Sequence, residues 1–315
     1  MRNLSSSTIV LGAAVAFLLA GAAHRTTAQP SSRNHVRSIS TPDGEDFTSC
    51  DQIKIETNDH RNVARSEEDF TVTRAAASPL RVDLGHGNGV FVRGWDRDDY
   101  SVRACKGAVP ESESGGAEML KRISVRMEGG DVRVEGPSGD DWFVFILMQA
   151  PKNAALDLSS VNGAVGLYEV SGKISAHAEN GPVSLKHCTG DIEAGTQNGP
   201  VSFSGSGGHL HLRTDNGPID VSLEGRTWND GELEAHDSNG PLSLRIPPDY
   251  ESGVVVEASG YSPMHCSSDA CSQAQRTWDD NARRIEFGHK PVVVRMSTVN
   301  GPVSVKTQDG SRDRF

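Results

Sequence analysis

Residues 173–190 read KISAHAENGPVSLKHCTG, and residues 191–208 follow the same pattern as DIEAGTQNGPVSFSGSGG. Both segments place Asn-Gly-Pro at the same point, and the pair Asn-Gly returns along the chain. Its members are Asn162, Asn180, Asn198, Asn216, Asn239 and Asn300, followed by Gly163, Gly181, Gly199, Gly217, Gly240 and Gly301. The first three spacings are 18 residues each, the fourth is 23 and the last is 61. Fixed self-similarity of this kind indicates stacked structural units.

Each unit contains two pairs of apolar residues, and polar or small residues alternate with them. The first pairs are Leu156 and Leu158, Ile174 and Ala176, Ile192 and Ala194, Leu210 and Leu212, Leu233 and Ala235, and Val294 and Met296. The second pairs begin three residues after each Asn, at Val165, Val183, Val201, Ile219, Leu242 and Val303. This period of two predicts two short, half-buried β-strands per unit, and no helical period fits the same residues.

The Asn-Gly pairs predict one corner of each unit. Asn and Gly tolerate positive φ, so we expect the chain to reverse tightly there. Proline follows the glycine from the second unit onward, and it lacks an N–H, which favours a corner over the interior of a strand ladder. In stacked units the equivalent asparagine side chains would form a ladder along the corner.

Two strands and two corners in 18 residues make one flattened coil, which cannot bury its own apolar face. Stacking such coils at the inter-strand spacing of about 4.8 Å would create a continuous interior. The predicted fold class is therefore all-β, a single-stranded β-solenoid or β-helix of about 18-residue coils with Asn-Gly turns and irregular N-terminal capping strands. A run of antiparallel hairpins is the alternative, because Asn-Gly is also a strong hairpin signal.

The predicted organisation starts with a secretory signal peptide at residues 1–28, cleaved after Ala28 or, alternatively, after Ala23. An uncleaved anchor helix is the other interpretation, but an apolar run of about 15 residues is short for a span of about 20. A flexible leader at 29–46 would follow, and then one adhesin-like β-solenoid domain at 47–307. Its predicted parts are regular coils at 155–226, 232–245 and 293–307 and a loop insertion at 246–290, with a disordered tail at 308–315.

Five cysteines fit an exported protein, in which disulfides are permitted. Cys266 and Cys271 are the candidate disulfide, and Cys50 with Cys105 is a second possible pair. Zinc bound by the 266/271 pair with His265 is the alternative, although no second ligand pair lies nearby. Cys188 falls at a repeat corner, where we interpret it as a small, partly buried residue.

The charge balance excludes some partners. Without residues 1–28 the chain has 29 basic residues (31 minus Arg2 and Arg25) and 42 acidic ones, a formal charge of −13. Nucleic acid and anionic membranes both require a basic face, so neither is predicted as a partner. We also predict no membrane insertion after signal removal, because no second long apolar run exists.

With the repeats laid out, the chain resembles a bacterial family of unknown function described as "putative adhesins", with adhesin-like repeat domains. The resemblance rests on residues 92–96 (VRGWD), 150–158 (APKNAALDL), 161–165 (VNGAV) and 299–303 (VNGPV), and it covers roughly 70–307. The proline after Asn-Gly and the 266/271 cysteine loop depart from the family pattern. The resemblance implies an exported β-solenoid-like domain with a role in adhesion or the cell envelope, and it brings no catalytic residues.

No catalytic motif is present, and no cofactor is predicted. In the coil register His211 lies between Glu193 and Glu234 on the outward face, where His177 and His236 form a second column. Such columns could bind a metal, but a solvated polar face is the favoured interpretation.

The predicted function is therefore an exported, non-catalytic, adhesin-like binding protein of the cell envelope or surface. It would be periplasmic, cell-surface or secreted, and its partner would be an unidentified envelope or extracellular glycan or protein. The alternatives are a polymerising envelope scaffold and a polysaccharide-acting β-helix enzyme.

Overall fold

The computed structural model describes residues 36–40, 47–57, 62–74, 78–85, 88–110, 115–139 and 141–308. The predicted signal peptide and residues 309–315 of the predicted tail lie outside this part of the chain. Contacts separate Met1–Arg33 from Asn34–Phe315, and only the second unit contains described residues. No helix in the described ranges is long and apolar enough to cross a membrane.

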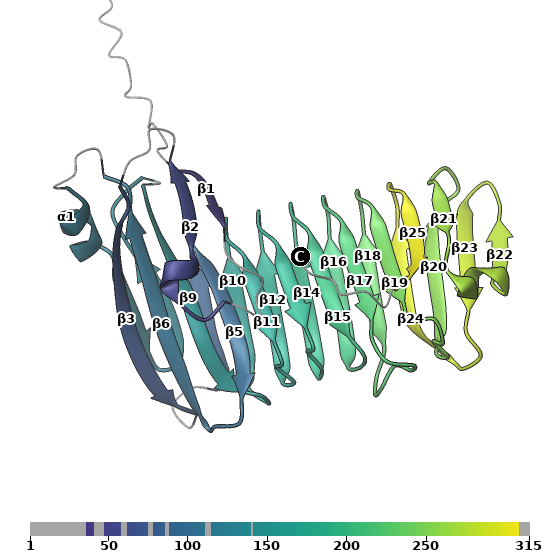
Figure 1. Ribbon diagram of the computed structural model, residues 1–315, viewed down its shortest axis with the longest axis horizontal. Helices are drawn as coiled ribbons and strands as arrows, with labels where there is room; N and C mark the ends of the chain where they lie inside the picture. Colours follow the sequence, from purple (N-terminus) through teal and green to yellow (C-terminus); the bar gives the residue numbers. More distant parts are fainter. Residues whose placement is uncertain are drawn as a thin grey trace, which may run out of the picture. The chain divides into compact units, whose positions relative to one another are not determined.

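The regular repeats form two sheets, and the chain alternates between them (Figure 1). The first sheet contains β10 (Leu156–Ser160), β12 (Lys173–Ala178), β14 (Asp191–Thr196), β16 (His209–Thr214), β18 (Leu233–Asp237) and β24 (Val292–Thr298). The second contains β11 (Val165–Tyr168), β13 (Val183–Lys186), β15 (Val201–Gly205), β17 (Ile219–Leu223), β19 (Leu242–Ile246) and β25 (Val303–Thr307). Each strand pairs in parallel with its equivalent in the next repeat, and Leu156 pairs with Ile174 in the 18-residue register. The antiparallel-hairpin alternative is therefore wrong for these strands.

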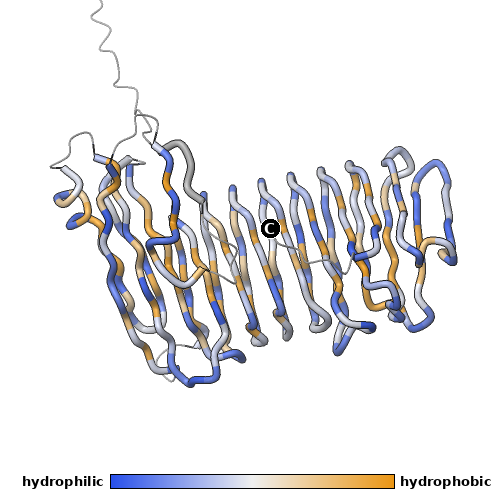
Figure 2. The backbone as a smooth tube through the Cα atoms, in the orientation of Figure 1, coloured by the Kyte–Doolittle hydropathy of each residue, from blue (hydrophilic) through white to orange (hydrophobic). Residues whose placement is uncertain are grey.

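The interior lies between the two sheets and consists of the residues predicted to point inward. Strand β16 alternates exposed and buried residues along its whole length, and Leu210 and Leu212 are both buried. Figure 2 shows the same alternation of polar and apolar residues along the coils. Burying a Leu, Ile or Val side chain contributes roughly 1.5–3 kcal/mol, so repetition of this small set holds the stack together.

The 23-residue spacing between the fourth and fifth asparagines has a structural cause. The extra residues bulge out between β17 and β18, and their Trp228 is buried with 8 % exposure. Its indole Nε1–H donates to the carbonyl of Gly208 at 3.0 Å, and its ring lies 5.8 Å from that of Phe203. The insertion thus closes the side of the core without shifting the register of β16 against β18.

The N-terminal end of the stack is built differently from the coils. Strands β4 (Leu80–Leu84) and β5 (Gly89–Trp95) pair in parallel with β10 and β11 and so precede the first regular coil. Beyond them lie β8 (Asp131–Glu135) and β9 (Trp142–Pro151), also parallel. The outer strands are antiparallel: β3 (Ala64–Thr73), β6 (Asp99–Ala108) and β7 (Ser124–Glu128), with the helix α1 (Gly115–Lys121) nearby.

The leader predicted to be flexible at 29–46 includes a strand. β1 (Val36–Ser40) pairs antiparallel with β2 (Lys54–Thr57), which follows the short 3-10 helix η1 (Cys50–Gln52). A disulfide joins Cys50 to Cys105, with 5.4 Å between their Cα atoms, and attaches this segment to β6. The pairing with β2 is the reason that part of the leader is ordered.

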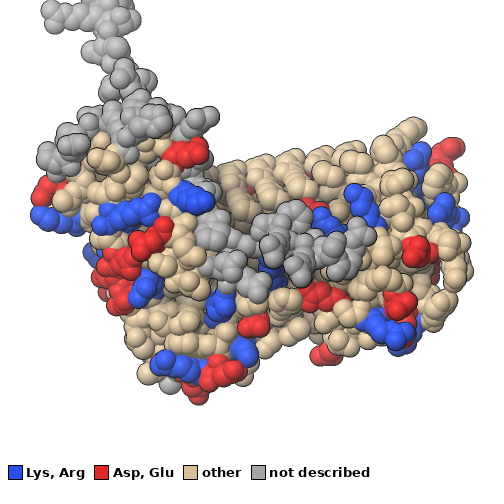
Figure 3. All heavy atoms as spheres, in the orientation of Figure 1, with Lys and Arg blue, Asp and Glu red and all other residues tan. Residues whose placement is uncertain are grey.

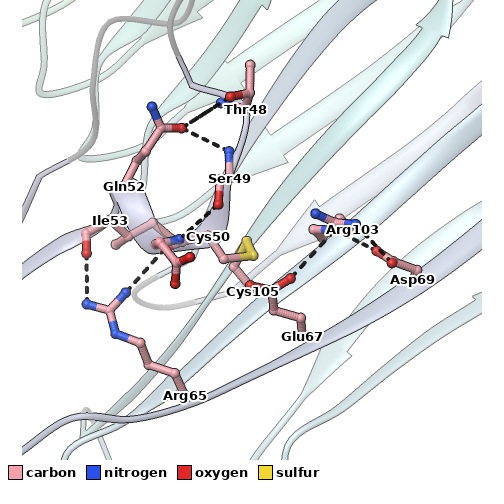
Figure 4. Close-up of a disulfide and its surroundings, with 11 residues drawn as sticks. Thr48, Ser49, Cys50, Gln52, Ile53, Arg65, Glu67, Asp69, Arg103 and Cys105 are labelled. Atoms are coloured by element: carbon pink, nitrogen blue, oxygen red, sulfur yellow. Dashed lines mark hydrogen bonds and ion pairs between the residues drawn. A yellow bond between two sulfur atoms is a disulfide. The ribbon is translucent and has the colours of Figure 1, made fainter.

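Figure 4 shows how the segment around Cys50 is held. The Arg65 guanidinium donates to the carbonyls of Cys50 at 3.2 Å and Ile53 at 2.8 Å. On the other side of the two cysteines in this view, Arg103 donates two hydrogen bonds to Asp69, at 2.7 and 3.0 Å, and they lower the pKa of that carboxyl. The segment also packs through a small apolar cluster, which consists of Phe47, Cys50, Ile53, Cys105, Phe143 and Phe145.

The prediction of a loop insertion at 246–290 is wrong. This stretch forms β20 (Gly253–Ser259), β21 (Met264–Cys266), the 3-10 helix η3 (Asp269–Ser272), β22 (Gln275–Trp278) and β23 (Ala282–Phe287). β20 pairs with β24 and β21 with β25, so the last coil in sequence lies between β18/β19 and this terminal layer. The reason is the open end of the stack: apolar side chains on β20 and β23, such as Val254, Val256 and Ile285, complete the core there.

Candidate functional site

The six Asn-Gly asparagines lie in one ladder along a corner of the stack. From Asn180 onward, each Nδ2 donates to the Oδ1 of the preceding asparagine. The distances are 2.9 Å (Asn180 to Asn162), 2.9 Å (Asn198 to Asn180), 3.0 Å (Asn216 to Asn198), 3.4 Å (Asn239 to Asn216) and 3.0 Å (Asn300 to Asn239). Because these side chains bond to one another and lie at the surface, the ladder holds the corner in register.

The glycines of this corner are needed for a different reason from the one predicted. In the described part of the chain, none of the six has a positive φ. A Cβ atom on Gly217 would lie 2.0 Å from the carbonyl oxygen of Gly199, and one on Gly181 would lie 2.1 Å from that of Gly163. The backbones of adjacent coils therefore approach so closely that only glycine fits.

A second column, buried under the asparagines, was missed by the sequence analysis. Each of its residues stands two positions before the Asn. Thr196 Oγ1 donates to the carbonyl of Gly181 at 3.0 Å, Thr214 Oγ1 to that of Gly199 at 3.1 Å, and Thr298 Oγ1 to that of Gly240 at 3.3 Å. The signal was present in the repeats, because a hydroxyl residue recurs at this position.

The main cavity is a groove of about 1150 Å³ on the outer face of the first sheet. Its lining comes from nine strands in consecutive sheet positions, from β4 at one end to β23 at the other. Outward side chains that line it include Asp83, Ser159, His177, Glu193, His211, Arg213, Glu234, His236, Glu257, Arg284, Arg295 and Ser297. At about 4.8 Å per strand, eight steps give a length of about 38 Å. No aromatic Phe, Tyr or Trp side chain is among the described lining residues.

The predicted histidine columns lie in this groove. His211 Nδ1 is 3.3 Å from Glu234 Oε2, and His236 Nδ1 is 2.9 Å from Ser297 Oγ. Glu193 is the strand neighbour of His211, and Gly195 is that of His177. No group of three or more His, Cys, Asp or Glu side chains within the described ranges is arranged to hold a metal ion. The columns therefore bring hydrogen-bonding groups together in pairs.

Several charged side chains of the groove are bonded to one another. Arg213 Nη2 lies 3.1 Å from Asp215 Oδ1, and Arg284 forms an ion pair with Glu257. Figure 3 shows blue and red groups interspersed among neutral residues on the face in view. The groove thus offers both donors and acceptors, and its described lining contains six carboxylates and three guanidinium groups.

Near β13 and β15, a Ser, a Glu and a His come together outside the groove. Glu224 accepts from Ser204 Oγ at 2.5 Å and lies 2.9 Å from His187 Nδ1. The carboxylate lies between the two side chains: the His187 backbone N–H donates to the Ser204 carbonyl at 2.7 Å, but the imidazole is bonded to Glu224 and not to the serine hydroxyl. The imidazole is therefore not placed to take the hydroxyl proton directly, as activation of a nucleophile would require. Nearby Cys188 is buried, and burial raises the pKa of its thiol to about 11, which keeps it protonated and unreactive.

Cys266 and Cys271 form a disulfide with 5.9 Å between their Cα atoms. This bond uses both sulfurs, so the zinc alternative with His265 is wrong. With Cys50–Cys105, the structure has two disulfides among the described residues, and such bonds indicate an oxidising compartment such as the cell envelope or the exterior.

The fold and the groove together define an all-β protein with two large sheets and a polar outer groove. No protein-family model matches the chain, and no curated protein is significantly similar to it. A solved "putative cell adhesion protein" from Clostridium sporogenes ATCC 15579 is similar at 10 % identity and a TM-score of 0.33, over 78 % of this chain and 100 % of that one.

Two further solved structures are similar over 78 % of this chain and 97 % of theirs. One is a "putative adhesin" from Bacteroides fragilis NCTC 9343, at 9 % identity and a TM-score of 0.26. The other is a "putative lipid binding protein" from Parabacteroides distasonis ATCC 8503, at 10 % identity and a TM-score of 0.27.

Proposed function

We propose that the protein is an exported, non-catalytic binding protein whose polar groove holds an extended, uncharged glycan of the cell envelope or the exterior. In this proposal the coils form a β-solenoid of the adhesin-like type, and the first sheet is the binding face. The observation that carries it is the groove of about 1150 Å³, which continues over consecutive strands of this sheet.

The chemistry of the lining supports a polyhydroxylated ligand. Serine, histidine, glutamate and arginine side chains alternate, so hydroxyl groups of a ligand would meet both donors and acceptors. The guanidinium groups of Arg213 and Arg284 already have carboxylate partners, which disfavours a strongly anionic ligand. A groove about 38 Å long fits a linear polymer better than a small compact molecule.

The test is binding of linear neutral and N-acetylated oligosaccharides of increasing length, measured by isothermal titration calorimetry. Affinity should increase with length until the groove is filled. Arg213 is an exposed residue of β16 in the middle of the groove, and Arg213→Ala should weaken binding about tenfold or more, the effect of losing one or two hydrogen bonds to a ligand.

Arg245→Ala is the matched control, because Arg245 lies on β19 of the second sheet and does not line the groove. It should leave binding unchanged. Equal losses in the two variants, or affinity independent of ligand length, would contradict the assignment of the groove.

A second candidate function is a scaffold that associates end to end. The observation in its favour is β22, an edge strand whose four residues are all exposed, including Trp278 at 54 % exposure. Tyr261, two residues after the end of β20, is 92 % exposed. Unpaired strand edges can template association. Sedimentation velocity over a range of concentrations distinguishes the two: growth of long oligomers that Trp278→Lys abolishes would favour the scaffold.

A further inference from the structure

The buried column beneath the asparagines contains one residue that breaks its pattern. Along the first sheet, Thr196, Thr214, Asp237 and Thr298 are register neighbours, and all four are buried. The threonines act as donors: the hydroxyl of each donates a hydrogen bond to the glycine carbonyl of the preceding coil. Asp237 is fully buried with 0 % exposure, yet it has a carboxyl group at this position.

The carboxyl oxygen Oδ2 of Asp237 occupies the place of the threonine hydroxyls. A Cβ atom on Gly199 would lie 3.2 Å from Thr196 Oγ1, and one on Gly301 would lie 3.2 Å from Thr298 Oγ1. The equivalent atom on Gly240 would lie 2.8 Å from Asp237 Oδ2 and 2.2 Å from the carbonyl oxygen of Gly217. By this equivalence, Oδ2 is directed at the Gly217 carbonyl.

The two carboxyl oxygens have different partners. Oδ1 accepts a hydrogen bond from the backbone N–H of Asn239 at 3.0 Å. Oδ2 is buried and receives no hydrogen bond from the described residues. A carboxylate oxygen can accept hydrogen bonds but cannot donate them, and the same is true of the carbonyl oxygen that it faces. A hydrogen bond between them therefore requires a proton on Oδ2.

We propose that Asp237 is a pH-sensitive joint of the stack: its protonated carboxyl donates to the Gly217 carbonyl as the threonines do, and its ionised carboxylate opposes that carbonyl. Protonation forms the O–H···O bond, and ionisation releases the proton to solvent and leaves two buried acceptors face to face. Burial supports this by raising the pKa of Asp237 from 3.8 to about 6, against a smaller lowering by the Asn239 N–H.

The surrounding charges do not supply another partner for Oδ2. On the preceding coil, Asp215 is paired with Arg213 at 3.1 Å and accepts from Ser238 at 3.5 Å. On its own strand, His236 faces the other side of the sheet and bonds to Ser297 of β24. The flanking members of the column, Thr214 and Thr298, are neutral and already donate to other carbonyls.

The direction of the pH effect follows from the raised pKa. The pKa of Asp237 is higher in the folded protein than in the unfolded chain. Its protonated carboxyl therefore contributes fully to the free energy of unfolding below about pH 4, and this contribution is lost as the pH rises to about 6. A difference of about two pKa units corresponds to a change of about 100-fold in the folding equilibrium constant. The stack should therefore tighten at this corner in acid.

The experiment compares the wild-type protein with Asp237→Asn in urea denaturation, followed by tryptophan fluorescence, between pH 4 and pH 8. The asparagine amide can donate to Gly217 and its carbonyl can accept from Asn239, so the variant reproduces the protonated form without titrating. We expect the wild-type unfolding constant to rise about 100-fold relative to that of the variant between about pH 4 and 6.5. Parallel profiles for the two proteins would overturn the proposal.

Asp237→Thr provides a second variant, because it restores the residue of the flanking coils. It should also lack the pH-dependent step. The Ser238 amide, which donates to the Thr214 carbonyl of the preceding coil at 3.1 Å, reports the joint locally. Its hydrogen exchange, measured by mass spectrometry or NMR, should accelerate with pH in the wild type beyond the chemical rate and do so less in both variants. Equal protection factors in all three proteins across this range would also refute the joint.

Discussion

Replacing Gly217 with alanine tests why glycine occupies the Asn-Gly corner. The added Cβ would lie 2.0 Å from the carbonyl oxygen of Gly199 and 2.6 Å from its carbon. Ordinary contact begins at 3.4 Å, so the corner must move by about 1.4 Å (3.4 minus 2.0) to accept a methyl group. Among the bonds that cross this junction, two side-chain bonds lie next to the clash, from Thr214 to the Gly199 carbonyl at 3.1 Å and from Asn216 to Asn198 at 3.0 Å.

The magnitude follows from these two effects. Overpacking a close backbone contact costs roughly 1–3 kcal/mol. Losing the two hydrogen bonds adds about 1 kcal/mol each. We therefore expect Gly217→Ala to lower the free energy of unfolding by about 3 to 5 kcal/mol, measured from the urea midpoint at constant slope.

Two controls separate steric contact from backbone conformation. Gly85→Ala meets nothing within 4 Å and should change stability by no more than about 1 kcal/mol. Gly225 has a φ of +68° with its nearest contact at 4.0 Å, so Gly225→Asn should be tolerated, because asparagine adopts this conformation. Gly217→Asn should be as damaging as Gly217→Ala. Stability retained by Gly217→Asn but lost in Gly217→Ala would refute the close-approach argument and favour a conformational one.

Further predictions concern the column, the ladder and the cysteines. Thr214→Val leaves the Gly199 carbonyl without its side-chain donor in the core and should cost about 1–2 kcal/mol in urea denaturation. Asn198→Ala removes two exposed ladder bonds and should cost about 1 kcal/mol or less; a larger loss would show that the ladder does more than hold register. The Cys50–Cys105 disulfide spans 55 residues, so replacing both cysteines with serine should lower the free energy of unfolding by about 4 kcal/mol through loop entropy. An unchanged melting temperature would contradict this. Cys188 should not react with a thiol reagent in the folded protein at pH 8 and should react on unfolding; rapid labelling of the native state would contradict its burial.

Local sequence was sufficient where the structure repeats. The 18-residue period, the alternation of apolar residues and the Asn-Gly-Pro corners predicted both strands of each coil and an all-β fold, because equivalent residues occupy equivalent environments in every coil. The pairing of Cys266 with Cys271 was also predictable, since they lie only five positions apart in a polar stretch.

Tertiary structure decided the features that depend on what lies in the next coil or at the end of the stack. Residues 246–290 contain no repeat, so their role as the terminal layer depends on the open edge that β24 and β25 present. The groove arises only when outward side chains from nine strands are placed side by side. Asp237 appears in sequence as one acid among many, and its unusual surroundings exist only because stacking buries its carboxyl beside the glycine backbone of the corner, with one oxygen left without a hydrogen bond in the described part of the chain.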